Sequence, residues 1–202
     1  MRPFLKQVLG LDGMLKLLFV FFAHVFTLTA LAGQVDHERL IQADREPGSW
    51  LTHARNYAED RHSPLTQITP DNIGQLGLAW YFDTRTTRGL EASPLVIDGR
   101  MYFTTSWSQV FALDARTGEQ LWHFDPQVPK AWGVNACCDV VNRGVAAWGE
   151  AVFGGTLDGR LVALHRDDGR VLWQTLTIDA EKPYTITGAP RVVNGQVIIG
   201  NG

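Results

Sequence analysis

Cysteine is scarce in this sequence, and so are long hydrophobic runs and any excess of basic charge. The 202 residues contain two cysteines, Cys137 and Cys138, which are adjacent. A bridge between neighbouring residues closes almost no loop, so it removes little entropy from the unfolded chain. The pair is therefore a poor staple for the fold, and its position needs another explanation.

The one long hydrophobic run lies at the N-terminus. Arg2, Lys6 and Lys16 precede LLFVFFAHVFTLTALAG, in which about 15 residues are strongly apolar, fewer than the roughly 20 that a membrane-spanning helix needs. The triplet Ala-Leu-Ala that ends at Ala32 has the small-x-small form of a signal peptidase site. We predict a signal peptide cleaved after Ala32; the alternative is a retained membrane anchor.

Basic residues do not outnumber acidic ones. The chain has 18 Lys and Arg against 21 Asp and Glu. Cleavage after residue 32 removes three of the basic residues and one of the acidic residues, which leaves a net charge of −5. A mildly acidic chain without a basic stripe argues against nucleic-acid binding. Because disulfides persist outside the cytosol, the cysteine pair of an exported chain is a candidate bridge rather than a metal or redox pair.

Two segments repeat. QVFALDARTGEQLWHF (109–124) and RLVALHRDDGRVLWQT (160–175) each contain an apolar run, a turn ending in Gly and a short run with Trp. Three pairs are 51 residues apart: Ala112 and Ala163, Gly118 and Gly169, and Trp122 and Trp173. A period near 50 residues, made of short strands and Gly turns, is typical of a β-propeller or a related array.

A hairpin pattern precedes each repeat. SPLVIDGRMYFTT (93–105), GVAAWGEAVFGGTLDG (144–159) and APRVVNGQVIIGNG (189–202) each place two apolar runs around a turn. We predict four-stranded units at roughly 90–124 and 144–175, and a third unit that stops after its second strand. Because a propeller needs at least about four blades, we interpret the sequence as the front part of a longer protein. A small complete β-domain is the alternative.

The segment 33–89 precedes this partial propeller of residues 90–202. Within it, the stretch 49–84 is expected to begin with a short helix, and Asp71-Asn72 can open another. LGLAWYF, with Trp80, resembles the Trp run of the repeats and could serve as the outer strand of the last blade, closing the ring. For Trp80, Trp122 and Trp173 we favour packing between blades over catalysis, with an indole N–H reaching a backbone acceptor. His165 and Asp168 replace Asp114 and Thr117 of the first repeat, which puts the local hydrogen bond of that turn in doubt but not the fold.

The residues at the start of each unit do not repeat. Glu91 precedes the first unit; Cys137, Cys138 and Arg143 precede the second; Thr185 and Thr187 precede the third. Each has an ordinary structural interpretation when taken singly. Their equivalent placement in three repeats, where the innermost strands of a propeller line its channel, favours one shared site.

The motifs LEASPLVIDGRMY, NACCDVVNRG, TLDGRL, PYTITGAPRVV and VIIGNG resemble the exported quinoprotein alcohol dehydrogenases, which use pyrroloquinoline quinone (PQQ) and calcium. The resemblance runs from about Trp50 to Gly202, and Cys-Cys-Asp-x-x-x-Arg is its most specific motif. It implies an all-β, eight-bladed propeller with tryptophan docking motifs, of which this chain holds about two and a half blades and the closing strand. The ethanol-type branch is the nearest in pattern.

The same resemblance assigns roles to six residues. It implies a disulfide between Cys137 and Cys138 that packs on one face of the quinone. Such a bridge is strained, because adjacent Cα atoms lie about 3.8 Å apart and disulfides prefer about 4.4–6.8 Å. Glu91 would hydrogen-bond the quinone rim, and Arg143 and Thr187 would contact its carboxylates. Gly202 would border the next contact loop.

The resemblance also implies what this chain does not supply. The catalytic Asp and the calcium ligands are expected after Gly202, as is any C-terminal haem c domain. Neither the cysteines nor the scattered histidines His37, His53, His62, His123 and His165 suggest a metal cluster. We therefore assign no catalytic residue and no metal ligand, and expect residues 33–202 alone to be inactive.

For the whole protein the resemblance implies a periplasmic enzyme. It would oxidise primary alcohols to aldehydes and pass electrons to a cytochrome c, a quinone or another periplasmic acceptor, with possible peripheral association with the membrane. The alternative is an exported Trp-motif propeller that binds protein partners without a cofactor. That class predicts a lipobox cysteine near the cleavage site and no cysteine pair at the channel, and the sequence shows the reverse.

Overall fold

The computed structural model describes residues 33–202, most of which form one compact unit over Gln34–Gly202. The predicted signal peptide and its cleavage site lie outside the described residues. Within the described part, no helix has the length and apolarity needed to cross a membrane. The strands are antiparallel, as the predicted all-β class requires.

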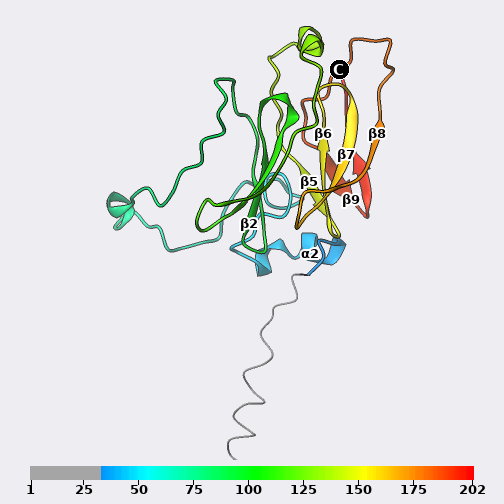
Figure 1. The fold of residues 1–202 in the computed structure, drawn as a ribbon. Coiled ribbons are helices and arrows are strands. Elements are labelled where there is room, and N and C mark those ends of the chain that lie inside the picture. Colours follow the sequence, from blue (N-terminus) through cyan, green and yellow to red (C-terminus); the bar gives the residue numbers. More distant parts are fainter. Residues whose placement is uncertain (1–32) are drawn as a thin grey trace, which may run out of the picture. The chain divides into compact units, whose positions relative to one another are not determined.

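Two four-stranded meanders form the body of the unit (Figure 1). The first comprises β1 (Leu95–Ile97), β2 (Arg100–Thr104), β3 (Val110–Asp114) and β4 (Gln120–Phe124). The second comprises β5 (Ala146–Trp148), β6 (Ala151–Gly155), β7 (Arg160–His165) and β8 (Val171–Leu176). In both sheets the spatial order equals the chain order. The two predicted repeat units are thereby confirmed.

Turn chemistry explains why these apolar runs fold back on themselves. Asp98 and Gly99, between β1 and β2, have φ values of 52° and 76°, and Asn194 and Gly195 have 50° and 75°. Two successive positive φ angles define the type I′ turn, whose twist matches that of a hairpin. Asn194 and Gly195 join β9 (Arg191–Val193) to β10 (Gln196–Ile198), the two strands predicted for the third unit.

The repeat extends to irregularities of register. The pairing of β3 with β4 shifts between Ala112 and Leu113, and that of β7 with β8 shifts between Ala163 and Leu164. These positions are 51 residues apart, like the repeated residues of the sequence. The two sheets are therefore copies in detail, which is the behaviour expected of propeller blades.

The helix expected near the start of 49–84 is misplaced. The helix α2 spans His37–Ile41 and is followed by the 3-10 helix η1 (Ala43–Arg45). Asp36 caps α2, because its side chain accepts a hydrogen bond of 2.8 Å from the Arg39 N–H. Near residue 54 the chain turns instead, since Ala54 and Arg55 both have positive φ. The expected helix after Asp71-Asn72 does form, as the 3-10 helix η2 (Ile73–Gln75).

Trp80 packs as expected, although its segment forms no strand with the described residues. A Cβ added to Gly118 would lie 2.5 Å from the Trp80 ring, and one added to Gly169 would lie 2.7 Å from the Trp122 ring. Each indole thus lies directly against the turn glycine of a neighbouring unit. The ring-closing role of the Trp80 segment stays a prediction.

The core lies between the two sheets and the N-terminal segment. Leu95, Ile97, Val152 and Leu164 are among its fully buried side chains. Val35 pairs with Gly149, and Trp50 pairs with Val96, through isolated bridges. The N-terminal segment is thereby tied to β1 of the first sheet and to the turn after β5 of the second.

Candidate functional site

The starts of the three units lie side by side. The Ser93 N–H donates to the Arg143 carbonyl at 3.2 Å, and the Arg143 N–H donates to the Thr187 carbonyl at 2.9 Å. Ser93, Arg143 and Thr187 precede β1, β5 and β9 respectively. Main-chain hydrogen bonds thus bring together three segments that are about 50 residues apart in the sequence.

Arg143 connects the predicted polar residues of all three segments. Its Nη2 forms an ion pair of 2.9 Å with the Glu91 carboxylate, and its Nη1 donates to the Thr187 hydroxyl at 2.8 Å. The Arg143 and Glu91 side chains are 40% and 42% exposed. An ion pair so exposed to solvent contributes at most about 1 kcal/mol to stability. Its main effect is to orient the guanidinium while leaving it accessible to a ligand.

Both cysteines are exposed free thiols in the structure. The predicted disulfide is therefore absent from the structure, and it stays a prediction for the oxidised, exported protein. A hydrogen bond with the Cys137 thiol raises the pKa of Cys138 above its ordinary value, and the Arg143 guanidinium acts in the opposite direction.

A hollow of about 180 Å³ adjoins the pair. Three predicted residues line it, namely Cys137, Thr187 and Gly202. Thr185, also noted at the start of the third unit, lines it too and exchanges main-chain hydrogen bonds of 2.8 and 3.1 Å with Gly202. The hollow therefore lies between the cysteine segment and the chain around Gly202. Glu91, Cys138 and Arg143 are not part of its wall.

Sequence reasoning missed four residues of this wall. They are Asn135, Gly188, Gly200 and Asn201. Added Cβ atoms at Gly188 and Gly200 would meet nothing within 4 Å. These glycines leave open space beside the polar groups. Asn135 carried no signal beyond its closeness to the cysteine pair.

A small apolar cluster supports the loop before the cysteines. Trp107, at a positive φ of 62°, packs on Gly133, where an added Cβ would lie 3.0 Å from the ring. The main-chain N–H of Trp107 donates to the Val140 carbonyl at 2.9 Å, and the Lys130 ammonium lies 3.9 Å from the centroid of the Trp107 ring. These contacts hold the 3-10 helix η4 (Lys130–Asn135) on one side and Val140 on the other. The position of the cysteine pair between them is thereby restricted.

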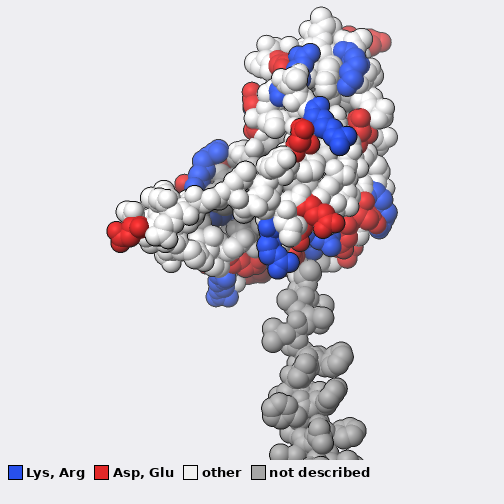
Figure 2. Space-filling model, turned by 60° about the vertical axis from the view of Figure 1, so that its left-hand side comes forward, with Lys and Arg blue, Asp and Glu red and all other residues white. Residues whose placement is uncertain are grey.

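Larger hollows lie elsewhere, without the predicted residues. One of about 460 Å³ lies against Phe82, Phe111 and His123, and one of about 590 Å³ adjoins the turns at Gly99 and Asp114. Over residues 33–202, no group of three or more His, Cys, Asp or Glu could hold a metal ion. On the face drawn in Figure 2, acidic and basic side chains are interspersed, without a continuous stripe of either sign.

The two four-stranded sheets and the third hairpin have the architecture of a β-propeller, with polar side chains gathered at the starts of its units. Residues 50–202 match the family "PQQ: Glucose/ethanol/alcohol dehydrogenase, beta-propeller domain". The chain belongs to this family of quinoprotein dehydrogenases.

Individual relatives agree with the family. The chain is 55% identical, over 87% of its length, to the quinohemoprotein alcohol dehydrogenase ADH IIB of Pseudomonas putida, and 58% identical over 77% to the 1-butanol dehydrogenase (cytochrome c) of Thauera butanivorans. The solved structure of ADHIIG from Pseudomonas putida superposes with a TM-score of 0.82 at 53% identity, over 85% of this chain. The chain spans about a quarter of the length of these proteins, namely 25%, 23% and 25%.

Proposed function

We propose that this chain is the N-terminal portion of a PQQ- and calcium-dependent alcohol dehydrogenase. The whole protein would oxidise primary alcohols to aldehydes and pass the electrons to a cytochrome c or a quinone. The arrangement of Glu91, Arg143 and Thr187 beside the cysteine pair, in a chain of this family, is the observation that carries the proposal.

The residues present fit a planar anion such as PQQ. PQQ carries three carboxylates, which match an accessible guanidinium fork and hydroxyl donors. Arg143 is oriented by Glu91 and Thr187, and the Thr185 hydroxyl donates to the Gly202 carbonyl at 3.2 Å. Because 180 Å³ is below the roughly 300–1,000 Å³ of complete ligand sites, these residues would form one part of the wall.

Each residue has a distinct role in this proposal. Arg143 would bind one carboxylate of PQQ and Thr187 another, while Glu91 fixes the guanidinium and reaches the quinone rim. Cys137 and Cys138 would cover one face of the ring and keep water from it. Bound PQQ supplies the acceptor for the hydride that leaves the carbinol carbon. We assign no proton transfer to residues of this chain.

Further parts of the proposal rest on the family resemblance. They are calcium, haem c, the disulfide between Cys137 and Cys138, and peripheral membrane association. Export to the periplasm after cleavage behind Ala32 rests instead on the apolar N-terminal run and its small-x-small triplet. No described residue is assigned to calcium. N-terminal sequencing of the exported protein should begin at Gly33, whereas a sequence that begins at Met1 would support the retained anchor.

The alternative of a cofactor-free propeller scaffold is not favoured. The relatives that share about half of the residues of this chain are named as alcohol dehydrogenases. Fold likeness alone would not separate the two classes, because propellers serve both. The polar residues beside the cysteine pair support the enzyme class, because they match the chemistry of an anionic cofactor.

The test uses the full-length protein that contains this chain. Purified apoprotein is reconstituted with PQQ and Ca²⁺, and dye-linked oxidation of ethanol is followed together with aldehyde formation. Arg143→Lys keeps the charge but loses the fork, so we expect PQQ affinity to fall about ten- to a hundredfold. Arg170→Lys is the control, because Arg170 is exposed and pairs with Asp168 in an outer turn. No oxidation by the unmodified protein, or equal PQQ affinity in both variants, would contradict the proposal.

A further inference from the structure

Asn142, the residue before Arg143, occupies the same place in its unit as two residues of the candidate site. It lies four residues before β5, as Glu91 lies four residues before β1 and Thr187 four before β9. Glu91 and Thr187 both contact the Arg143 guanidinium, and the Glu91 side chain is 42% exposed. Asn142 is only 1% exposed. It therefore faces the interior at a position where its two equivalents reach Arg143.

The Asn142 side chain holds the turn that contains Arg143. Its Oδ1 accepts from the Gly144 N–H at 3.1 Å, so the side chain bridges the residues on either side of Arg143. Its Nδ2 donates to the Gly155 carbonyl at 2.8 Å, at the end of β6. Because one partner is a donor and the other an acceptor, they determine which way the amide points. The turn is thereby fastened to the second strand of the same sheet.

The main chain on both sides of Arg143 is restrained as well. The Asn142 carbonyl accepts from the buried Thr104 hydroxyl at 3.3 Å. Gly144 has a φ of +125°, and a Cβ added there would lie 3.0 Å from the Ser93 carbonyl oxygen. The turn thus has little room to move, and it sets the direction in which the Arg143 side chain leaves the main chain.

The buried amide is a firmer restraint than the contacts of the guanidinium. The ion pair between Arg143 and Glu91 is open to solvent, where water and salt weaken such pairs. Breaking the hydrogen bonds of Asn142 would instead leave polar groups unpaired and out of reach of water, which is costly. The position of Arg143 therefore depends mainly on the turn that Asn142 holds.

Building on the proposed PQQ binding, we propose that Asn142 is a positioning residue for Arg143. It holds the turn in place before PQQ arrives, so the guanidinium fork needs no ordering when it binds a carboxylate of PQQ. The buried Asn142 side chain acts only through Arg143 and takes no part in the redox step.

The test measures PQQ binding to the full-length apoprotein in the presence of Ca²⁺, by equilibrium dialysis. Asn142→Ala should weaken PQQ binding about tenfold, since it removes both side-chain hydrogen bonds of the turn. Asn142→Ser keeps an acceptor for the Gly144 N–H but cannot reach Gly155, so its affinity should lie between the two. Tyr102→Phe is the matched control, because it too removes a buried donor to a main-chain carbonyl, that of Arg166. It should bind PQQ as the unmodified protein does.

A double-mutant cycle distinguishes positioning from a general loosening of the fold. If Asn142 acts through the guanidinium fork, Asn142→Ala should lower PQQ affinity less than about threefold in the Arg143→Lys background. A loosened fold would instead lower the affinity by the same factor in both backgrounds, to within about twofold. If Asn142→Ala does not fold, Asn142→Ser provides the same comparison.

The outcomes separate this proposal from the proposed function. An unmodified full-length protein that binds no PQQ would overturn the proposed function, and the positioning role with it. A protein that binds PQQ, with an unchanged affinity in Asn142→Ala and Asn142→Ser or with equal losses in both backgrounds, would overturn the positioning role alone.

Discussion

The two four-stranded sheets share strand order and register, yet their outer strands differ in burial. Trp122 in β4 is 7% exposed, whereas Trp173, its equivalent in β8, is 44% exposed. Every residue of β8 is exposed. Because the strands within each sheet pair alike, pairing within the sheet is not what buries the tryptophan.

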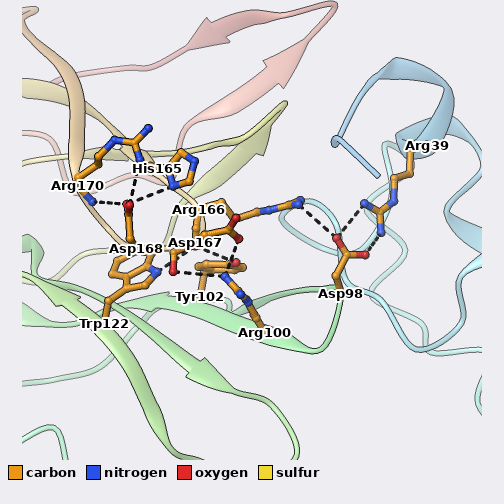
Figure 3. Close-up of polar contacts among 10 residues, drawn as sticks. All are labelled: Arg39, Asp98, Arg100, Tyr102, Trp122, His165, Arg166, Asp167, Asp168 and Arg170. Carbon is orange, nitrogen blue, oxygen red and sulfur yellow. Dashed lines mark hydrogen bonds and ion pairs between the residues drawn. The ribbon is translucent and has the colours of Figure 1, made fainter. Parts of the chain in front are cut away.

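Contacts with the next unit make the difference. The indole N–H of Trp122 and the Tyr102 hydroxyl both donate to the Arg166 carbonyl of the second unit, at 2.9 and 3.2 Å (Figure 3). Trp173 packs on Phe153 of its own sheet, with ring centroids 5.8 Å apart. The outer strand of each blade is therefore buried by the next blade. The exposure of its tryptophan shows whether that next contact is present.

The two sheets also close their last turn with different side chains. Asp114, four residues before Gly118, accepts from the Arg116 and Thr117 N–H groups at 2.9 Å each. Asp168, immediately before Gly169, accepts from the Arg170 N–H and contacts His165 Nδ1, both at 3.1 Å. The side-chain hydrogen bonds of the two turns therefore differ, while the backbone turn is the same in both.

The largest effect is expected where a tryptophan meets a glycine. Gly169→Ala would place a Cβ 2.7 Å from the Trp122 ring at a φ of +73°. Strain and overpacking together should lower the free energy of unfolding by about 3 kcal/mol, measured by urea denaturation of the full-length protein. Gly99→Ala is the control, because Gly99 has φ +76° but nothing within 4 Å, so it should cost only about 1 kcal/mol. Equal losses would mean that the contact between units is unimportant.

The next largest effect is a loss of stability at alkaline pH, and it depends on a hydroxyl that the first sheet has and the second lacks. Burial raises the pKa of Tyr102 to about 12, and the second sheet has Phe153 at the equivalent position. The raised pKa contributes stability that is fully present below the unfolded value of about 10 and is lost as pH rises through 12. We expect about 2 kcal/mol of loss over this interval, measured by urea midpoints at several pH values.

Tyr102→Phe makes the first sheet resemble the second and should remove this part of the alkaline loss. Below pH 9 the variant should differ from the unmodified protein by a constant amount, about 1 kcal/mol for the hydrogen bond to Arg166. A variant that loses stability above pH 10 as steeply as the unmodified protein would show that other groups dominate there.

A third prediction compares the two tryptophans directly in the full-length protein. Trp122→Phe removes the N–H that reaches the Arg166 carbonyl and should cost about 1–2 kcal/mol. We expect Trp173→Phe to cost as much, because a following unit would cover the face that is exposed in this chain. Thermal unfolding of both variants measures this. A Trp173→Phe effect within about 0.5 kcal/mol, as for an ordinary surface change, would contradict the proposal that further strands of the third unit cover Trp173 in the full-length protein.

The strands were predictable because local chemistry determines them. Turn pairs such as Asp98-Gly99 and Asn194-Gly195 mark the hairpins, and the 51-residue period fixes the third and fourth strands. The N-terminal helix was misplaced, since its position depends on the Asp36 cap and on positive φ values near Arg55. Positive φ angles at Ala54 and Arg55 cannot be inferred from residue type, because neither is a glycine.

The closeness of the residues at the starts of the units was predictable, but their contacts were not. Repeat position brought Glu91, Arg143 and Thr187 together, and the structure links all three. The direction of the Arg143 fork and the presence of Asn135 in the wall depend on side-chain orientation and on the path of η4. Periodicity carries information about backbone position alone, so these features required the structure.

The smallest expected effect concerns the two turn carboxylates under acid. Hydrogen bonds from the Thr117 and Arg116 N–H groups lower the pKa of Asp114, and the Arg170 N–H lowers that of Asp168. Lowered pKa values contribute stability that is present above the ordinary value of about 3.9 and is lost as pH falls through the folded value. Asp114→Asn and Asp168→Asn keep an acceptor oxygen but remove the titration. Both variants should therefore lose thermal stability less steeply than the unmodified protein below pH 4.

Salt should distinguish the two carboxylates, because Asp168 also faces the charges of Arg170 and His165. We expect 0.5 M NaCl to reduce the stability difference between Asp168→Asn and the unmodified protein more than the corresponding difference for Asp114→Asn. An equal response to salt would mean that main-chain hydrogen bonds hold both turns in the same way, despite the different position of the carboxylate.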